Sequence, residues 1–226
     1  MRILIAGAGR GGLSLAVYLQ GQGHSVTILE RDPLITRRAF EQHGIVALEG
    51  DATDVGILRQ ADPSRADVVL AMLHRDADNL AVASLARLLG ATRVMVRMRD
   101  PEYRAVYLAA GVQQILSETE VLVGALATAI EFEAVRHSMV LGAGESIAIE
   151  IVVPEDAAVV GRAVSEIAVD AGFPGSCVIA GMTLDGAVKA PRGATIIERG
   201  TQLLIVSARA DLSRTIGFFL APAAKK

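Results

Sequence analysis

Apolar and polar positions alternate in blocks through the first half of the chain. Short continuous runs of Val, Ile, Leu and Ala are typical of parallel strands buried on both faces, and helically spaced apolar residues separate them. The runs predict six strands, at 2–6, 25–30, 45–49, 67–71, 93–97 and 112–116. The stretches between them predict helices near 10–22, 33–43, 54–60, 76–89 and 101–110. This succession predicts an α/β, Rossmann-like doubly wound parallel sheet with the strand order 3-2-1-4-5-6.

A longer helical segment follows the sixth strand, from residue 118 to residue 136. Its apolar residues cover nearly the whole circumference of the predicted helix, which is typical of a helix buried on all sides. A single sheet covers only one side of such a helix. We therefore expect this crossover helix to meet a second domain or another subunit.

The pattern changes after His137. The run from Ser138 to Gly144 contains Gly and Ser and is interpreted as a linker. Shorter apolar runs, interrupted by Pro and Gly, then predict short strands and one or two short helices at 147–153, 164–170, 177–182, 187–189, 203–207 and 210–219. The expected domains are a nucleotide-binding domain at 1–137 and a smaller α+β domain at 138–226.

Composition narrows the class of protein. The chain has 226 residues, of which 52% are hydrophobic, and a formal net charge of −3, which argues against a general nucleic-acid binder. No apolar window approaches the ~18 residues that a membrane span needs, and the first strand leaves no room for a signal peptide. Cys177 is the only cysteine, so neither a disulfide within the chain nor a cysteine metal cluster is expected. These features fit a cytoplasmic protein without direct membrane insertion.

The turn between the first strand and the first helix carries the pattern G-x-G-x-x-G, at residues 7–12. Gly7 allows a sharp turn, Gly9 lets a pyrophosphate approach the backbone, and Gly12 allows the helix to pack closely on the sheet. The helix N-terminus then offers free N–H groups to phosphates. Alone, the glycines also fit a purely structural turn; between a strand and a helix they favour nucleotide binding.

An acidic residue, Glu30, ends the second strand. At this spacing a carboxylate accepts hydrogen bonds from ribose hydroxyls and repels a 2′-phosphate, so NAD(H), ATP or ADP is expected rather than NADP. Asp32 shares this role or caps the next helix, with Pro33 at the first helical position.

Further candidates lie where the other strands end. Arg10 is a phosphate ligand or a solvated residue, and Asp51 either contacts the adenine amino group or caps the following helix with Thr53. Arg97 is placed to reach phosphates, whereas Glu118 is a helix cap, a ligand contact or a metal contact, and no metal site is otherwise expected. The candidate cofactor-binding residues are Gly7, Gly9, Arg10, Gly11, Gly12, Glu30, Arg31, Asp51, Ala52, Ala71, Met72, Leu73 and Arg97.

Catalysis requires a proton donor or acceptor beside the cofactor. The second domain contains no His and no Tyr, and its acidic residues form no visible acid–base pair. The residues therefore favour binding without chemistry. An NAD-dependent oxidoreductase with a reduced second domain stays the alternative.

The chain resembles the Trk/Ktr-type potassium uptake regulatory family, whose N-terminal domain is known as the RCK or KTN domain and is followed by a TrkA-C type domain. The resemblance covers nearly the whole chain, and two departures lie in the second domain: Thr201 follows Gly200 where Asp is usual, and a typical Arg is missing near Gly181. The matching segments are 7–12, 30–32, 50–53, 67–71, 78–79, 117–118, 160–167 and 191–206.

The resemblance implies a cytoplasmic gating subunit, bound at the inner face of the cell membrane to a membrane potassium-translocating subunit. It implies that NAD(H), ATP or ADP binding changes the shape of a homo-oligomer and thereby the ion flux. With one copy of the unit, the oligomer is expected to be a dimer that assembles into an octameric ring. A regulator of another cation transporter is the remaining alternative.

Overall fold

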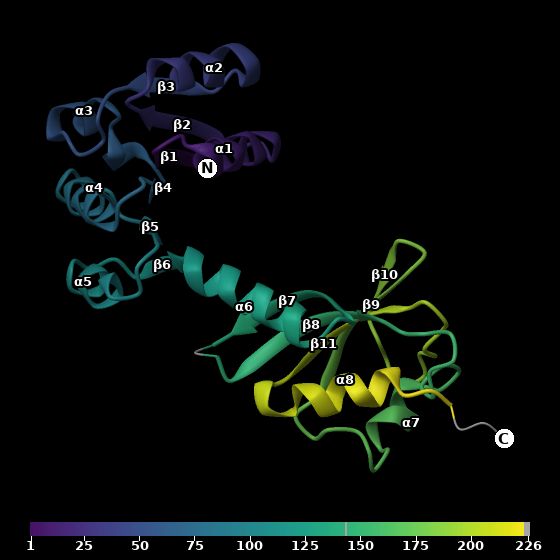
Figure 1. Cartoon of the computed structure of the whole chain (residues 1–226). Coiled ribbons are helices and arrows are strands. Elements are labelled where there is room, and N and C mark those ends of the chain that lie inside the picture. Colours follow the sequence, from purple (N-terminus) through teal and green to yellow (C-terminus); the bar gives the residue numbers. More distant parts are fainter. Residues whose placement is uncertain (143, 224–226) are drawn as a thin grey trace. The chain divides into compact units, whose positions relative to one another are not determined.

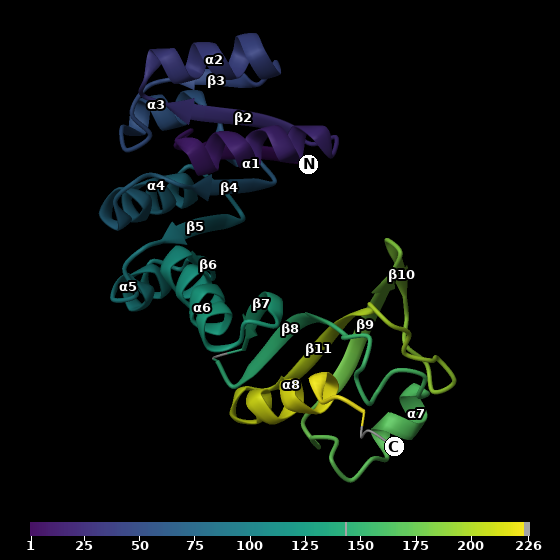
Figure 2. The ribbon, with the colours of Figure 1, turned by 45° about the vertical axis from the view of Figure 1, so that its right-hand side comes forward.

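The computed structural model describes residues 1–142 and 144–223 (Figures 1 and 2). The chain divides into two compact units, an N-terminal unit of Met1–Thr119 and a C-terminal unit of Glu120–Lys226. Each unit has its own sheet and its own hydrophobic core. Among the described residues, no helix has the length and apolar character needed to cross a membrane.

The N-terminal unit is built on a parallel sheet with the strand order β3-β2-β1-β4-β5-β6. This is the order that the alternation of strands and helices predicted, and the Rossmann-like fold is confirmed. Starting from β1, the chain adds β2 and β3 on one side of the sheet. It then returns and adds β4, β5 and β6 on the other side. The six strands are β1 (Arg2–Ala6), β2 (Ser25–Glu30), β3 (Val46–Glu49), β4 (Val68–Ala71), β5 (Val94–Met98) and β6 (Gln114–Ser117).

Helices cover both faces of this sheet. Helices α1 and α2 lie on one face and α3, α4 and α5 on the other, as the two ribbon views show (Figures 1 and 2). Their bounds are α1 (Arg10–Gly21), α2 (Pro33–His43), α3 (Val55–Gln60), α4 (Asp76–Leu88) and α5 (Tyr103–Ala109), with a short 3₁₀ turn η1 (Pro63–Arg65) before β4.

The double coverage explains why the strands are continuous apolar runs. In β1, Ile3 and Ile5 pack toward α1 and α2, whereas Leu4 and Ala6 pack into the core formed with α3, α4 and α5. Successive strand residues point to opposite faces, so both sets must be apolar. All four side chains are buried.

The crossover helix and the expected linker differ from the sequence prediction. Helix α6 spans Glu118–Glu131, and strand β7 (Val135–Leu141) follows it, so the helix does not continue to residue 136 and Ser138 lies in a strand. The domain boundary expected after residue 137 falls within β7. The strand forms because β7 pairs with the next strand, β8 (Ser146–Val152), over most of its length, and the helical pattern of the preceding residues does not reveal this pairing. Residue 143 of the expected linker lies outside the described residues.

The C-terminal unit is an antiparallel sheet with the order β10-β9-β11-β8-β7. Ile147, Ile149 and Ile151 alternate along β8 and are buried, and α8 covers them with Ile216 and Phe219 (Figure 2). The remaining elements are β8 (Ser146–Val152), α7 (Val164–Ala168), β9 (Val178–Leu184), β10 (Ala187–Lys189), β11 (Gln202–Ala208), η2 (Arg209–Asp211) and α8 (Leu212–Leu220).

Candidate functional site

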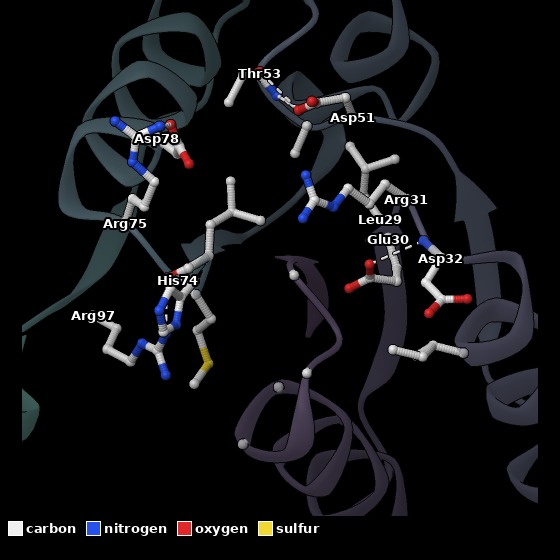
Figure 3. A pocket seen from close by; sticks show the side chains of 18 of the residues that line it. Leu29, Glu30, Arg31, Asp32, Asp51, Thr53, His74, Arg75, Asp78 and Arg97 are labelled. Carbon is white, nitrogen blue, oxygen red and sulfur yellow. Dashed lines mark hydrogen bonds and ion pairs between the residues drawn. The ribbon is translucent and has the colours of Figure 1, made fainter.

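A cavity of about 830 Å³ opens at the carboxyl ends of the parallel strands of the N-terminal unit (Figure 3). The strand order reverses between β1 and β4, and the crevice beside such a switch point is where doubly wound sheets bind ligands. The residues that line the cavity are Gly7, Gly9, Arg10, Gly11, Gly12, Leu29, Glu30, Arg31, Asp32, Ile35, Gly50, Asp51, Ala52, Thr53, Met72, Leu73, His74, Arg75, Asp78, Arg97 and Glu118.

The glycine turn forms the floor of the cavity, and at two of its positions the surrounding backbone leaves no room for a side chain. Gly7 has φ +99°, and a Cβ there would lie 3.0 Å from the backbone carbonyl of Met72. A Cβ on Gly12 would lie 2.0 Å from the Gly7 carbonyl oxygen. This oxygen belongs to the backbone, so no side-chain rotation could relieve the overlap. The close packing of α1 on the turn therefore requires glycine at position 12.

The N-terminus of α1 faces the cavity. Gly9 is the N-cap and supplies no side-chain hydrogen bond, and no acidic residue lies in the first turn. The first N–H groups of a helix have no partner within the helix and carry a partial positive charge, which favours an anion. A Cβ on Gly9 would meet nothing within 4 Å, so the backbone at this position is open to an approaching group.

Glu30 stands beside this turn, at the end of β2 (Figure 3). One carboxylate oxygen accepts the Ala8 N–H at 2.7 Å, and the other accepts the Asp32 N–H at 3.1 Å. These bonds fix the carboxylate next to the glycine turn. A carboxylate offers about four lone-pair positions, so Glu30 retains capacity to accept ribose hydroxyls.

Asp32 caps α2, one of the two roles left open from the sequence. Its carboxylate accepts the Leu34 N–H at 2.9 Å, and Pro33 follows as the first helical residue. The side chain still lines the cavity, next to Glu30 (Figure 3). Capping satisfies an N–H group that the helix itself leaves without a partner.

Asp51 is held in a turn after β3. Its Oδ1 accepts both the Thr53 hydroxyl at 2.7 Å and the Thr53 N–H at 2.9 Å. These hydrogen bonds, the hydroxyl first, lower the pKa of the Asp51 carboxyl, and the nearby Arg31 charge lowers it further. The alternative that Asp51 and Thr53 cap α3 is wrong, because Asp54 accepts from the Gly56 and Ile57 N–H groups.

A buried amide supports the opposite wall. Asn79, fully buried in α4, accepts the Leu73 N–H at 2.7 Å and donates to the carbonyls of Leu73 at 3.1 Å and Arg97 at 3.0 Å. It thus joins the loop after β4 to strand β5. Ala71, the last residue of β4, is fully buried and is the one candidate residue that does not line the cavity.

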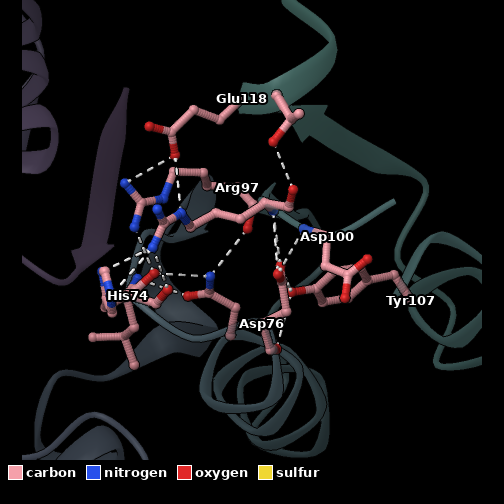
Figure 4. A network of polar contacts seen from close by, with 10 residues as sticks. His74, Asp76, Arg97, Asp100, Tyr107 and Glu118 are labelled. Carbon is pink, nitrogen blue, oxygen red and sulfur yellow. Dashed lines mark hydrogen bonds and ion pairs between the residues drawn. The ribbon is translucent and has the colours of Figure 1, made fainter. Parts of the chain in front are cut away.

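Arg97 and Glu118 lie on the same wall in a polar network (Figure 4). Arg97 donates to the Leu73 carbonyl at 2.7 Å, and its Nη1 is 3.4 Å from the Glu118 carboxylate. The Nε of Arg99 is 3.7 Å from the same carboxylate oxygen. His74 also lines the cavity, and its ring contacts the Arg99 guanidinium at 3.0 Å.

Asp76 anchors this network from behind. Its carboxylate accepts the N–H groups of Arg99 and Asp100 and the Tyr107 hydroxyl, whose oxygen is 2.9 Å away. Burial and the Asp76 carboxylate raise the pKa of Tyr107, so its hydroxyl stays protonated and donates. The segment after β5 is therefore tied to the start of α4.

Within the part of the chain that the structure describes, no group of three or more His, Cys, Asp or Glu side chains could hold a metal ion. The charged neighbours recorded for Glu118 are the guanidinium groups of Arg97 and Arg99, which repel a cation. The contacts of Glu118 that the structure shows are those of an ion-pair network.

Sequence reasoning missed part of the lining. Most of the additional residues lie next to a predicted cofactor-binding residue along the chain. The loops after the strands therefore contribute more residues to the cavity lining than the sequence predicted. Arg75 is the N-cap of α4 and Asp78 lies in its first turn, so both directly follow the loop after β4 (Figure 3). The missed residues are Leu29, Ile35, Gly50, Thr53, His74, Arg75 and Asp78.

Comparison with known proteins agrees with the fold. Over its full length the chain is 32% identical to a Trk system potassium uptake protein TrkA homolog of Archaeoglobus fulgidus, of which it spans 51%. It is 26% identical over 206 residues to one of Methanothermobacter thermautotrophicus, covering 91% of this chain and 93% of that protein. A structure of the GsuK channel bound to NAD covers 100% of this chain and 40% of its own, with a TM-score of 0.66 and 18% identity.

The chain thus spans about half of the Archaeoglobus protein and less than half of the GsuK chain. Family models match two parts of it: the TrkA-N domain over residues 3–118 and the TrkA-C domain over residues 148–220. The first match falls on the sheet that carries the cavity, and the second on the antiparallel sheet and α8. The sequence motifs and these matches agree that the chain belongs to the TrkA family, with a TrkA-N domain followed by a TrkA-C domain.

Proposed function

We propose that this chain is a nucleotide-binding regulatory subunit of a potassium uptake system. The observation that carries the proposal is the cavity at the switch point, where a free helix N-terminus and a fixed carboxylate, Glu30, face the same space. An anion and a ribose are the ligand parts that these two groups recognise.

The ligand in this proposal is NAD(H), ATP or ADP. Its first phosphates bind the N–H groups at the start of α1, with Arg10 adding a charged contact, and its ribose hydroxyls bind Glu30. The adenine lies near Asp51, whose Oδ1 is occupied by Thr53 while Oδ2 has no hydrogen bond recorded among the described residues. Glu30 disfavours the 2′-phosphate of NADP by charge repulsion.

The regulatory role is supported by the relatives' names. Two relatives are Trk system potassium uptake proteins, and the GsuK structure, which is similar in fold, is of a channel with NAD bound. In this proposal the partner is a membrane potassium-translocating subunit at the cytoplasmic face of the membrane. The chain acts as a homo-oligomer, and ligand binding shifts the population of its conformations.

Binding without catalysis is part of the proposal. The cavity holds carboxylates and arginines, but its carboxylates are engaged by N–H groups, a hydroxyl or guanidinium groups, as in Glu30, Asp51 and Glu118. Such engagement fixes ligand-binding groups in place. It does not provide a proton donor poised at a reacting carbon.

The test is a ligand screen on the purified full chain. Thermal shift and calorimetry with ATP, ADP, NAD, NADH and NADPH should show binding of the first four and weaker binding of NADPH. Light-scattering chromatography of the same samples should show a multimer. Stabilisation by NADPH alone, or turnover of NADH with a carbonyl substrate, would instead support an oxidoreductase.

Three variants sharpen this test. Glu30→Gln should weaken NAD binding about tenfold, because a charged acceptor of ribose hydroxyls is lost. Glu41→Gln changes the net charge equally on the exposed side of α2 and should leave binding unchanged. In vesicles containing the membrane subunit, potassium flux that responds to nucleotide in wild type should respond less with Arg10→Ala. Flux with no nucleotide response in wild type would contradict the regulatory role.

A further inference from the structure

A buried carboxylate stands behind the wall of the cavity. Asp76, the first residue of α4, is 7% exposed and does not line the cavity. Its carboxylate accepts the N–H groups of Arg99 at 3.1 Å and Asp100 at 3.0 Å. A further donor is the Tyr107 hydroxyl, whose oxygen is 2.9 Å away. Because a carboxylate loses its hydration when it is buried, each of these donors contributes to holding it in place.

The hydroxyl comes from a different helix. Tyr107 lies on α5, is fully buried, and donates both to the carboxylate of Asp76 and to its carbonyl oxygen, at 3.0 Å (Figure 4). Burial raises the pKa of Tyr107, so the hydroxyl keeps its proton. Phenylalanine would fill nearly the same space, so what the hydroxyl adds to the core is its bond to Asp76.

The start of α4 holds the backbone of β5 on both sides of Arg97. Asn79, further along α4, donates to the Arg97 carbonyl at 3.0 Å, while Asp76 binds the N–H groups of the residues that follow β5. Tyr107 in turn fixes the Asp76 carboxylate. The position of Arg97 therefore depends on a hydroxyl that lies outside the cavity lining.

Arg97 carries this support into the cavity. Its side chain is only 20% exposed and lines the cavity, and its Nη2 donates to the Leu73 carbonyl at 2.7 Å. Its Nε is buried and has no hydrogen-bond partner among the described residues. A buried N–H group without a partner is costly, and an oxygen acceptor supplied by a ligand would satisfy it.

The topology indicates which part of a ligand meets Arg97. A doubly wound sheet consists of two mononucleotide-binding halves, and a dinucleotide spans both. The glycine turn, Glu30 and Asp51 belong to the half built on β1, β2 and β3, where the proposed function places the AMP part. Arg97 lies on β5 in the other half, about 10 Å across the sheet from β1. That half meets the second nucleotide of the ligand.

We infer that Tyr107, acting through Asp76, is a positioning residue for the second half of a bound dinucleotide. It holds the backbone of β5 so that Arg97 presents its donors to the phosphate or ribose beyond the AMP part, and it touches no ligand itself. This inference rests on the proposed nucleotide-binding function. AMP, which ends before Arg97, gains nothing from this support.

The experiment compares the AMP and NAD⁺ affinities of wild type and Tyr107→Phe by calorimetry on the full chain. Phenylalanine keeps the buried ring and removes the hydroxyl. NAD⁺ should bind about three- to tenfold more weakly to the variant, as expected for one lost hydrogen bond to a carboxylate, while AMP affinity changes by less than about twofold. The NAD⁺-to-AMP affinity ratio is the readout, since a general loss of folding would weaken both ligands together.

Tyr103→Phe is the matched control. It removes a hydroxyl from the neighbouring ring of α5, whose centroid lies 6.1 Å from that of Tyr107, and it leaves the recorded bonds of Asp76 intact. The ratio should stay at its wild-type value. With Arg97→Ala already present, Tyr107→Phe should not lower the ratio further, because the side chain that it positions is gone.

Three results overturn the inference: an unchanged ratio in Tyr107→Phe, an equal fall in Tyr103→Phe, or a further fall when Tyr107→Phe is added to Arg97→Ala. Wild-type protein that binds NAD⁺ no more tightly than AMP also overturns it, while the binding of AMP upholds the proposed function. Absence of nucleotide binding in wild type overturns both.

Discussion

At the scale of single residues, the shape of the candidate site depends on glycines, which have no side chain and so allow the backbone segments to approach closely. The helix α1 approaches β1 so closely that Gly12 stands against the Gly7 carbonyl, and Gly7 itself turns with a positive φ against Met72. In contrast, Gly21 at the other end of α1 has nothing within 4 Å of an added Cβ. The same helix therefore contains one glycine that packing requires and one that it does not.

We expect Gly12→Ala to destabilise the N-terminal unit by about 1–3 kcal/mol and to abolish nucleotide binding, because the added methyl group would overlap a backbone oxygen and push α1 away. Gly21→Ala should be neutral or slightly stabilising, since alanine favours a helix. Denaturant unfolding of both variants measures the change in stability, and calorimetry measures the change in nucleotide affinity. Equal effects of the two substitutions would contradict the packing argument.

At the scale of elements, α6 carries more apolar surface than the chain covers. Its exposed large hydrophobic residues are Val121, Leu122, Val123, Leu126 and Ile130, with Ile130 83% exposed. Thr128 is the buried residue of this helix. The sequence pattern predicted burial on all sides, and the single chain leaves most of that surface open, as expected if another copy covers it.

If α6 forms the subunit contact of the proposed homo-oligomer, replacing Leu122 and Leu126 with Glu should reduce the mass of the particle measured by light scattering, because two charges would be buried in that contact. Leu34→Glu is the comparison, since Leu34 on α2 is 73% exposed and equally apolar. A particle of unchanged mass in the α6 variant would place the subunit contact elsewhere.

At the scale of the whole molecule, each unit is stabilised by its own core. The N-terminal unit has apolar clusters on both faces of its parallel sheet, and the C-terminal unit has one cluster between its antiparallel sheet and its helices. The cavity lies entirely within the N-terminal unit. A ligand bound there adds its binding free energy to the folded state of that unit.

Nucleotide at 100 times its dissociation constant should thus stabilise the N-terminal unit by about 2.7 kcal/mol and leave the C-terminal unit nearly unchanged. Hydrogen exchange along a denaturant series measures the free energy of unfolding of each unit separately. Peptides from β1–β4 report on the N-terminal unit, and peptides from β8 and β11 report on the C-terminal unit. Adenosine lacks phosphates and should bind more weakly, so at the same concentration it should raise the free energy of unfolding of the N-terminal unit by less. An equal shift in both units would mean that they unfold as one cooperative body.

Much of the fold followed from local pattern. The strands of the N-terminal unit are continuous apolar runs because both faces are covered, and their predicted bounds differ from the observed ones by at most two residues. Asp32 and Pro33 at the start of α2 are likewise a local capping pattern. The prediction failed between α6 and β8, because β7 forms by pairing with a strand that lies beyond a turn, and helical periodicity carries no trace of that pairing.

The sequence by itself determined the α/β class, the strand order, the glycine turn and the acidic residue beside it, because these depend on neighbours along the chain and on the handedness of crossovers. Only the tertiary structure decided what the side chains of separate strands do together. Asn79 joins the loop after β4 to strand β5, Asp54 rather than Asp51 caps α3, and Glu118 meets Arg97 and Arg99. These contacts depend on distances of a few ångströms between segments far apart in the chain, which no residue spacing encodes.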